Sequence, residues 1–188
     1  KYSAISFLCF LVEKDREFVT LDKDLDERWP KMKDIKDALA LIETGQVDEA
    51  YELLQHKLRS ATDDEKFVIV ELYEDWGFIE DAIKLLENLL ETYPKEGQLL
   101  TKLADLYMEV EDDEQAIQLL NQVDKADPFY LHSLLILADS YERDGLFEVA
   151  EQKLLEAEAL VSDEELFIVH FALAELYLSI GKAQAAIY

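Results

Sequence analysis

The chain of 188 residues has little of what builds cross-linked, metal-binding or loop-rich proteins. A single cysteine, Cys9, cannot form an intrachain disulfide, and three dispersed histidines leave little for a metal site. Only 5 glycines and 3 prolines occur, so turns and linkers are few. The sequence therefore excludes a disulfide framework, and we expect no metal and no cofactor.

Basic residues and long apolar runs are also scarce. Lys and Arg number 18 against 43 Asp and Glu, which gives a formal net charge of −25. Because nucleic-acid binding needs clustered basic side chains, no nucleic-acid partner is expected. The longest apolar-rich stretch, Tyr2 to Val12, is shorter than the roughly 20 residues of a membrane-spanning helix. We expect a cytoplasmic protein without a membrane partner.

Apolar residues are plentiful, at 50% of the chain, and they recur in an internal repeat. Alanines at five equivalent positions are separated by 32, 34, 34 and 36 residues, and a glycine stands five residues before four of them. The alanines are Ala50, Ala82, Ala116, Ala150 and Ala186, and the glycines are Gly45, Gly77, Gly145 and Gly181. Apolar spacings of three and four predict two amphipathic helices per unit, joined at the glycine and packed closely at the alanine.

A tyrosine recurs in the same frame, with a leucine or isoleucine four residues before it and a small residue or valine three before it. These tyrosines are Tyr73, Tyr107, Tyr141 and Tyr177. The register with small residues predicts helix–helix packing rather than a stacking platform for bases. The unit 97–130 shows the whole pattern as Leu100, Leu103, Ala104, Tyr107, Ala116, Leu120, Val123 and Pro128.

This pattern resembles the tetratricopeptide repeat, a 34-residue helix-turn-helix unit. The sequences of these repeats are similar to those of short cytoplasmic tetratricopeptide repeat proteins of Bacillus-type bacteria. The resemblance implies an all-α fold of antiparallel helix pairs stacked in a right-handed solenoid over residues 32–188, with about four repeats and a truncated fifth. The last unit stops at Tyr188 inside its second helix and the chain begins with Lys, so we interpret the sequence as a fragment open at both ends.

Residues 1–31 do not fit the repeat, and the charge changes near residues 31–36. Residues 1–36 hold 8 basic and 8 acidic side chains, so residues 37–188 carry the whole net charge. Two β-forming runs around a charged turn predict a hairpin in this segment. The alternative is translation of upstream DNA, because Glu27-Arg28-Trp29 can be encoded by a ribosome-binding sequence shortly before Met32.

No catalytic motif is present, and we expect no enzyme. The recurring glycines are committed to turns, His56, His132 and His170 share no ligand spacing, and Cys9 sits in an apolar run.

In the family that the chain resembles, the first helices of the units line a concave groove. Carried over, one groove position holds Phe67, Thr101, Leu135 and Phe171, the next holds Glu71, Asp105, Asp139 and Glu175, and a third holds Glu74, Met108, Glu142 and Leu178. Some members clamp a chaperone's carboxylate with basic residues here, and that clamp is absent. An acidic ladder beside an apolar strip predicts instead a basic or amphipathic protein segment as ligand.

We therefore expect a non-enzymatic scaffold or adaptor for protein–protein interaction. The alternative is a structural or regulatory module that acts through its convex face or solenoid ends, including self-association. A further alternative for the ladder is that its carboxylates only keep an acidic surface solvated.

Overall fold

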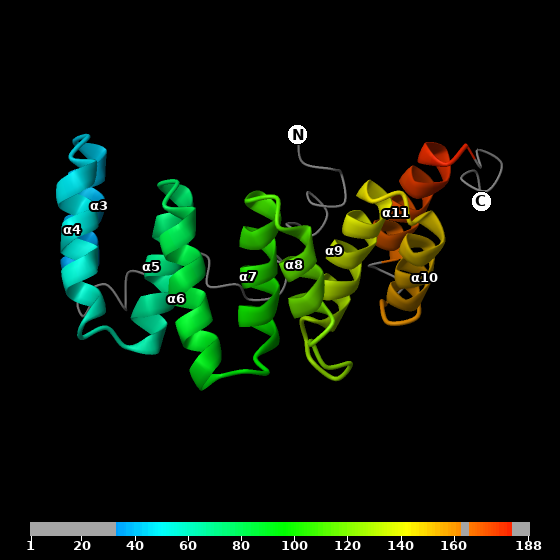
Figure 1. The fold of residues 1–188 in the computed structure, drawn as a ribbon, viewed down its shortest axis with the longest axis horizontal. Coiled ribbons are helices and arrows are strands. Elements are labelled where there is room, and N and C mark those ends of the chain that lie inside the picture. The colour runs from blue at the N-terminus through cyan, green and yellow to red at the C-terminus, as the bar shows by residue number, and fades with distance from the viewer. Residues whose placement is uncertain (1–32, 163–165, 182–188) are drawn as a thin grey trace. The chain divides into compact units, whose positions relative to one another are not determined.

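The computed structural model describes residues 33–162 and 166–181, and every regular element in these ranges is an α-helix (Figure 1). The hairpin predicted within residues 1–31 lies outside the described residues. The described helices fall into two compact units, residues 33–92 and residues 93–181. The all-α repeat architecture predicted from the sequence is confirmed.

The first unit contains two helix pairs. Helix α3 (Lys33–Glu43) packs on α4 (Val47–Leu58), and α5 (Asp63–Asp75) packs on α6 (Ile79–Thr92). The recurring spacing of the alanines has a structural reason within this unit: Ala50 and Ala82 are both fully buried between helices. A larger side chain there would hold the helix axes apart.

The second unit contains α7 (Gly97–Glu109), α8 (Asp113–Leu120), α9 (Tyr130–Arg143), α10 (Phe147–Glu158) and α11 (Leu166–Ser179). Its helices pair as α7 with α8 and α9 with α10, and α11 packs on α10. Within this unit α9 lies between α8 on one side and α10 and α11 on the other (Figure 1). Residues Leu131–Ser140 of α9 are buried without interruption, so α9 is the centre of the unit's core.

The recurring turn between paired helices has one geometry. In the turn after α5, the Gly77 N–H donates to the Glu74 carbonyl (3.0 Å) and the Phe78 N–H donates to the Tyr73 carbonyl (2.7 Å). These two bonds form the motif that ends a helix with a left-handed residue, here Gly77 at φ 78°. The carbonyls of Tyr107 and Tyr141 accept the same bond in their units, so the tyrosine and glycine registers describe a single turn.

The third turn departs from the glycine pattern. Glu111 occupies the left-handed position with φ 62°, and it is the only described non-glycine residue with positive φ. Its N–H still donates to the Met108 carbonyl (3.1 Å), and the Asp112 N–H donates to Tyr107 (2.8 Å). The turn therefore forms at the energetic cost of a side chain in that conformation, about 1–2 kcal/mol.

The junction of α4 and α5 is closed by a half-buried ion pair and a capping box. Thr62 accepts a hydrogen bond from the Glu65 N–H (3.3 Å), and the Glu65 carboxylate accepts one from the Thr62 N–H (2.8 Å). Lys57 on α4 contacts the other Glu65 oxygen at 2.8 Å. Burial raises the pKa of the Glu65 carboxyl, but the bonds from Lys57 and Thr62 outweigh it, and the pKa lies below its usual value.

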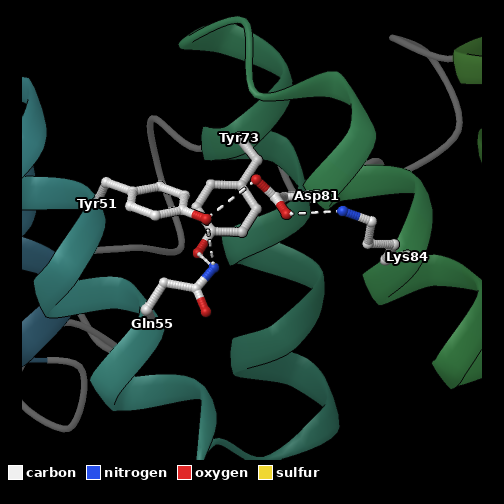
Figure 2. A network of polar contacts seen from close by, with 5 residues as sticks. All are labelled: Tyr51, Gln55, Tyr73, Asp81 and Lys84. Carbon is white, nitrogen blue, oxygen red and sulfur yellow. Dashed lines mark hydrogen bonds and ion pairs between the residues drawn. The ribbon is translucent and has the colours of Figure 1, made fainter.

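A polar network joins α4, α5 and α6 (Figure 2). The Gln55 amide donates to the hydroxyls of Tyr51 (3.0 Å) and Tyr73 (3.1 Å), and the Tyr51 hydroxyl donates to the Asp81 carboxylate (3.1 Å). Lys84 contacts the other oxygen of Asp81 at 3.4 Å. The tyrosine predicted as a packing residue thus also positions a neighbouring helix pair.

Helix α8 is shorter than the dozen residues that the repeat predicts. It ends at Leu120, and both the backbone N–H (3.1 Å) and the side-chain amide (2.7 Å) of the capping residue Asn121 donate to the Ile117 carbonyl. The following turn carries Asp127 to the start of α7, where its carboxylate accepts a hydrogen bond from the Gly97 N–H (3.2 Å). A Cβ at Gly97 would overlap that carboxylate, which explains a glycine outside the recurring turn.

Candidate partner-binding surface

The twelve predicted groove residues are divided between the two units. Phe67, Glu71 and Glu74 lie half-buried on α5 of the first unit. The other nine lie on α7, α9 and α11 of the second unit: Thr101, Asp105, Met108, Leu135, Asp139, Glu142, Phe171, Glu175 and Leu178. The second unit therefore holds the larger part of the predicted surface, and its geometry can be followed helix by helix.

The predicted apolar strip needs a correction at two positions. Thr101 is 3% exposed and Leu135 is 1% exposed, so neither presents a surface to a ligand in this structure. The Thr101 hydroxyl donates to the Gly97 carbonyl one turn earlier (2.9 Å), and Leu135 belongs to the core formed with α11. Phe171, at the same position of the repeat, is 49% exposed. The strip is exposed on α11 and is packed on α7 and α9.

Two carboxylates of the acidic ladder lie beside basic side chains that the sequence analysis did not place there. Asp139 is 6% exposed, and the Arg143 Nε lies 3.5 Å from its carboxylate. The same guanidinium contacts Asp113 at the start of α8 at 3.0 Å. Asp105 on α7 lies 3.7 Å from the Nε2 of the buried His132 on α9.

The contacts of these two basic residues with the ladder differ in how readily they can be predicted from the sequence. Arg143 follows Asp139 by four residues on one helix, which is the spacing of an ion pair and could have been recognised. His132 is 27 residues from Asp105, so only the packing of α7 against α9 reveals their contact.

Glu175 keeps an acidic environment. Burial raises the pKa of its carboxyl, and the nearby carboxylates of Glu142 and Asp139 raise it further. Among the described residues, neither Glu142 nor Glu175 forms an ion pair with a base. The end of α9 and the middle of α11 thus hold carboxylates that repel each other.

The third predicted position varies most between helices. Met108 is half-buried on α7, and its Sδ accepts a weak hydrogen bond from the Ser140 hydroxyl at 3.8 Å. Leu178 on α11 is 62% exposed. Phe171, Glu175 and Leu178 follow one another at spacings of four and three residues, which places an acidic group between two apolar ones on one helix face.

The described residues show neither metal chemistry nor a membrane span. No group of three or more potential metal ligands comes together in residues 33–162 and 166–181. In the same ranges no helix has the length and apolar character to cross a bilayer.

Comparison with known proteins fits this helical geometry. Residues 78–136 match a tetratricopeptide repeat family model, and residues 143–188 match a model described as YpiA-like tetratricopeptide repeats. The chain is a tetratricopeptide repeat protein. It is 35% identical over 153 residues to the TPR repeat-containing protein YpiA of Bacillus subtilis, covering 81% of this chain and 36% of that protein. The chain thus spans about a third of the length of this curated relative.

Solved structures with the same fold are more distant in sequence. A Podosopora anserina putative kinesin light chain with TPR-like repeats is 22% identical, with a TM-score of 0.62 over 82% of this chain and 88% of that one. A tetratricopeptide repeat protein from Parabacteroides merdae is 19% identical, with a TM-score of 0.65 over 82% and 62%. A MamA structure is 24% identical, with a TM-score of 0.55 over 63% and 68%. These likenesses support the fold.

The family is one of protein-interaction scaffolds, and the repeat units now have structural bounds. In this tetratricopeptide repeat chain the first and second helices of each described pair are α3 and α4, α5 and α6, α7 and α8, and α9 and α10. Helix α11 is the first helix of a further unit. The predicted groove residues lie on the first helices, from α5 to α11.

Proposed function

We propose that the chain is a non-enzymatic, cytoplasmic adaptor whose second unit binds a basic, amphipathic protein segment along the first helices of its repeats. The observation that carries the proposal is the exposed Phe171 and Leu178 beside the carboxylates of Glu142 and Glu175. Apolar groups exposed in a row favour association with another apolar surface, and the acidic rim selects a cationic partner.

Electrostatics supports the same ligand class. The chain carries a net charge of −25, so a cationic segment approaches it faster at low salt than a neutral one does. A helix with one apolar face and a basic rim satisfies both the apolar and the acidic part of the surface.

The proposal is tested with two labelled synthetic helices that share a leucine face and carry lysine or glutamate elsewhere. We expect the full chain to bind the lysine peptide, to ignore the glutamate peptide, and to lose most of the affinity when Asp105 and Glu175 are both replaced by Lys. The matched control, Glu114→Lys with Glu148→Lys, makes the same charge change on exposed residues of the second helices α8 and α10. An equal loss of affinity in the two variants would show that the peptide is held only by non-specific charge attraction. The proposed binding along the first helices would then be wrong.

A second candidate function is self-association through an end of the solenoid. It is favoured by Phe167, which is exposed together with Phe171 and Leu178 on α11, whereas Leu131 and Leu135 at the equivalent places on α9 are buried. Light scattering of the chain at several concentrations distinguishes the two functions. A monomer at all concentrations supports the adaptor, and a dimer that Phe167→Gln dissociates supports self-association.

A further inference from the structure

The acidic row on α7, α9 and α11 is not uniform, because its carboxylates differ in what already contacts them. Asp139 is held by Arg143, which also holds Asp113, and Asp105 lies against His132. Glu142 and Glu175 have no basic contact among the described residues, and they lie near each other. Asp139 is therefore partly compensated by Arg143, Asp105 has a histidine beside it, and Glu142 and Glu175 have neither within the part of the chain that the structure describes.

The uncompensated place adjoins the exposed apolar side chains. Along α11, Phe171 lies four residues before Glu175 and Leu178 lies three residues after it, which corresponds to about 6 Å and about 4.5 Å along the helix axis. Phe171 is 49% exposed and Leu178 is 62% exposed. An acidic group flanked at these spacings by apolar groups matches a ligand helix in which a cation is flanked in the same way.

We propose that Glu142 and Glu175 together bind one Lys or Arg of the partner, and we call this pair of carboxylates the seat. Phe171 and Leu178 then contact apolar ligand residues that lie four positions to one side of this cation and three positions to the other. This inference rests on the proposed function and names the ligand pattern that the surface recognises. Arg143 acts within it as an internal competitor, because it occupies Asp139 and places a positive charge beside the seat. The cation of the ligand therefore contacts Glu142 and Glu175, and it does not contact Asp105.

The electrostatic environment of the seat supports a proton-linked interaction. The charged groups that act on Glu175 are Glu142 and Asp139 from α9, and Arg143 contacts Asp139. Burial and these carboxylates raise the pKa of Glu175 above its usual value, which favours its neutral form when no ligand is bound. A bound cation favours the ionised form, so affinity for a cationic ligand should rise as pH increases through the titration of Glu175.

The probe is a labelled, alanine-rich synthetic helix with one Leu-x-x-x-Lys-x-x-Leu pattern. The control peptide has the same composition, but its lysine is moved by two positions and so lies on the opposite face. We expect the full chain to prefer the patterned peptide by roughly ten-fold, and we expect Glu142→Gln with Glu175→Gln to remove that preference. The same double variant should lose the rise of affinity with pH.

Three further variants separate the seat from general acidity. Glu114→Gln with Glu148→Gln makes the same charge change on α8 and α10, and Asp105→Asn tests the neighbouring position; each should change affinity by less than about two-fold. Arg143→Gln should tighten binding, because the competing cation is removed, whereas the exposed Lys95→Gln should not. Circular dichroism and thermal unfolding of each variant show that it keeps the fold.

The outcomes distinguish this inference from the proposed function. If the chain binds the lysine-rich amphipathic helix but not the patterned one, or if Asp105→Asn weakens binding as much as the seat variant, the inference is wrong and the adaptor function stands. If the chain binds neither helix, both are wrong. Preference for the patterned peptide, lost only in the seat variant and strengthened by Arg143→Gln, establishes the seat.

Discussion

At the scale of single residues, the structure shows contacts that connect segments far apart in the chain. Asp127 holds the Gly97 N–H at the start of α7 and also accepts a hydrogen bond from the Phe129 N–H (2.8 Å). One carboxylate therefore fixes both the beginning of a repeat and the turn that leads into the following one. A Cβ at position 97 would overlap this carboxylate, so a larger residue there would have to displace it.

Replacement of Gly97 by Ala should lower the free energy of unfolding by about 1–3 kcal/mol, since the new Cβ displaces the Asp127 carboxylate and its hydrogen bond. Urea denaturation followed by circular dichroism measures the change. The double variant Gly97→Ala with Asp127→Ala serves as control: the second substitution should then cost less than it does in the parent chain, because the contact with Gly97 is already lost and only the bond from the Phe129 N–H remains to be removed. Full additivity of the two losses would show that the contact does not form in solution.

At the scale of helices and turns, the sequence predicts most of the repeat because one set of contacts produces several signals. One turn and one helix contact contain the tyrosine carbonyl, the left-handed glycine and the buried alanine. Each of these recurring residues therefore predicts the same position of the turn in the repeat. The early end of α8 at Leu120 has no such signal in the residue pattern.

The exception at Glu111 gives a prediction about the same element. Replacement of Glu111 by Gly should raise stability by about 1 kcal/mol or slightly less, because relief of the left-handed strain exceeds the additional entropy of the unfolded chain. The denaturation midpoint reports the gain. In the opposite direction, Gly145→Ala in the equivalent turn at φ 75° should lower the midpoint. A midpoint for Glu111→Gly at or below that of the parent chain would contradict the strain argument.

The candidate surface could be predicted from sequence only in part. The repeat register places the twelve residues on the first helices, and the structure confirms that placement. The register does not show burial, which removes Thr101 and Leu135 from the surface, nor the distant base that meets Asp105. The position of a residue in the repeat determines the face of its own helix on which it lies. Its exposure and its charged contacts depend on the side chains of the neighbouring helices.

At the scale of the whole molecule, tyrosine hydroxyls bonded to carboxylates recur in both units. Tyr51 bonds to Asp81, Tyr130 bonds to Glu156 (2.8 Å), and Tyr177 bonds to Glu151 (2.6 Å). The bond to Glu151, together with burial, raises the pKa of Tyr177 to about 12. Burial first, and then the paired carboxylate, raise the pKa of Tyr51 and Tyr130 as well.

These bonds predict an alkaline limit to stability. The neutral hydroxyl is favoured in the folded state, so its contribution is fully present below the unfolded pKa of about 10 and is lost as pH rises towards about 12. We expect the denaturation midpoint to fall across this interval. Tyr177→Phe should make the fall shallower, and Tyr141→Phe, at the equivalent place on α9, should not. An identical pH slope in Tyr177→Phe and the parent chain would show that this bond contributes nothing.

The bond between Asp127 and Gly97 also determines where the chain can be cut. The two residues stand 30 positions apart, nearly one repeat length, so the first turn of α7 is completed only by a segment that lies beyond α8. A truncation that ends with α8 would leave the Gly97 N–H without this acceptor, and amide hydrogen exchange at the start of α7 would accelerate. A self-sufficient piece of this protein must therefore extend through Phe129, and repeat boundaries drawn at the helix ends would divide a cooperative folding unit.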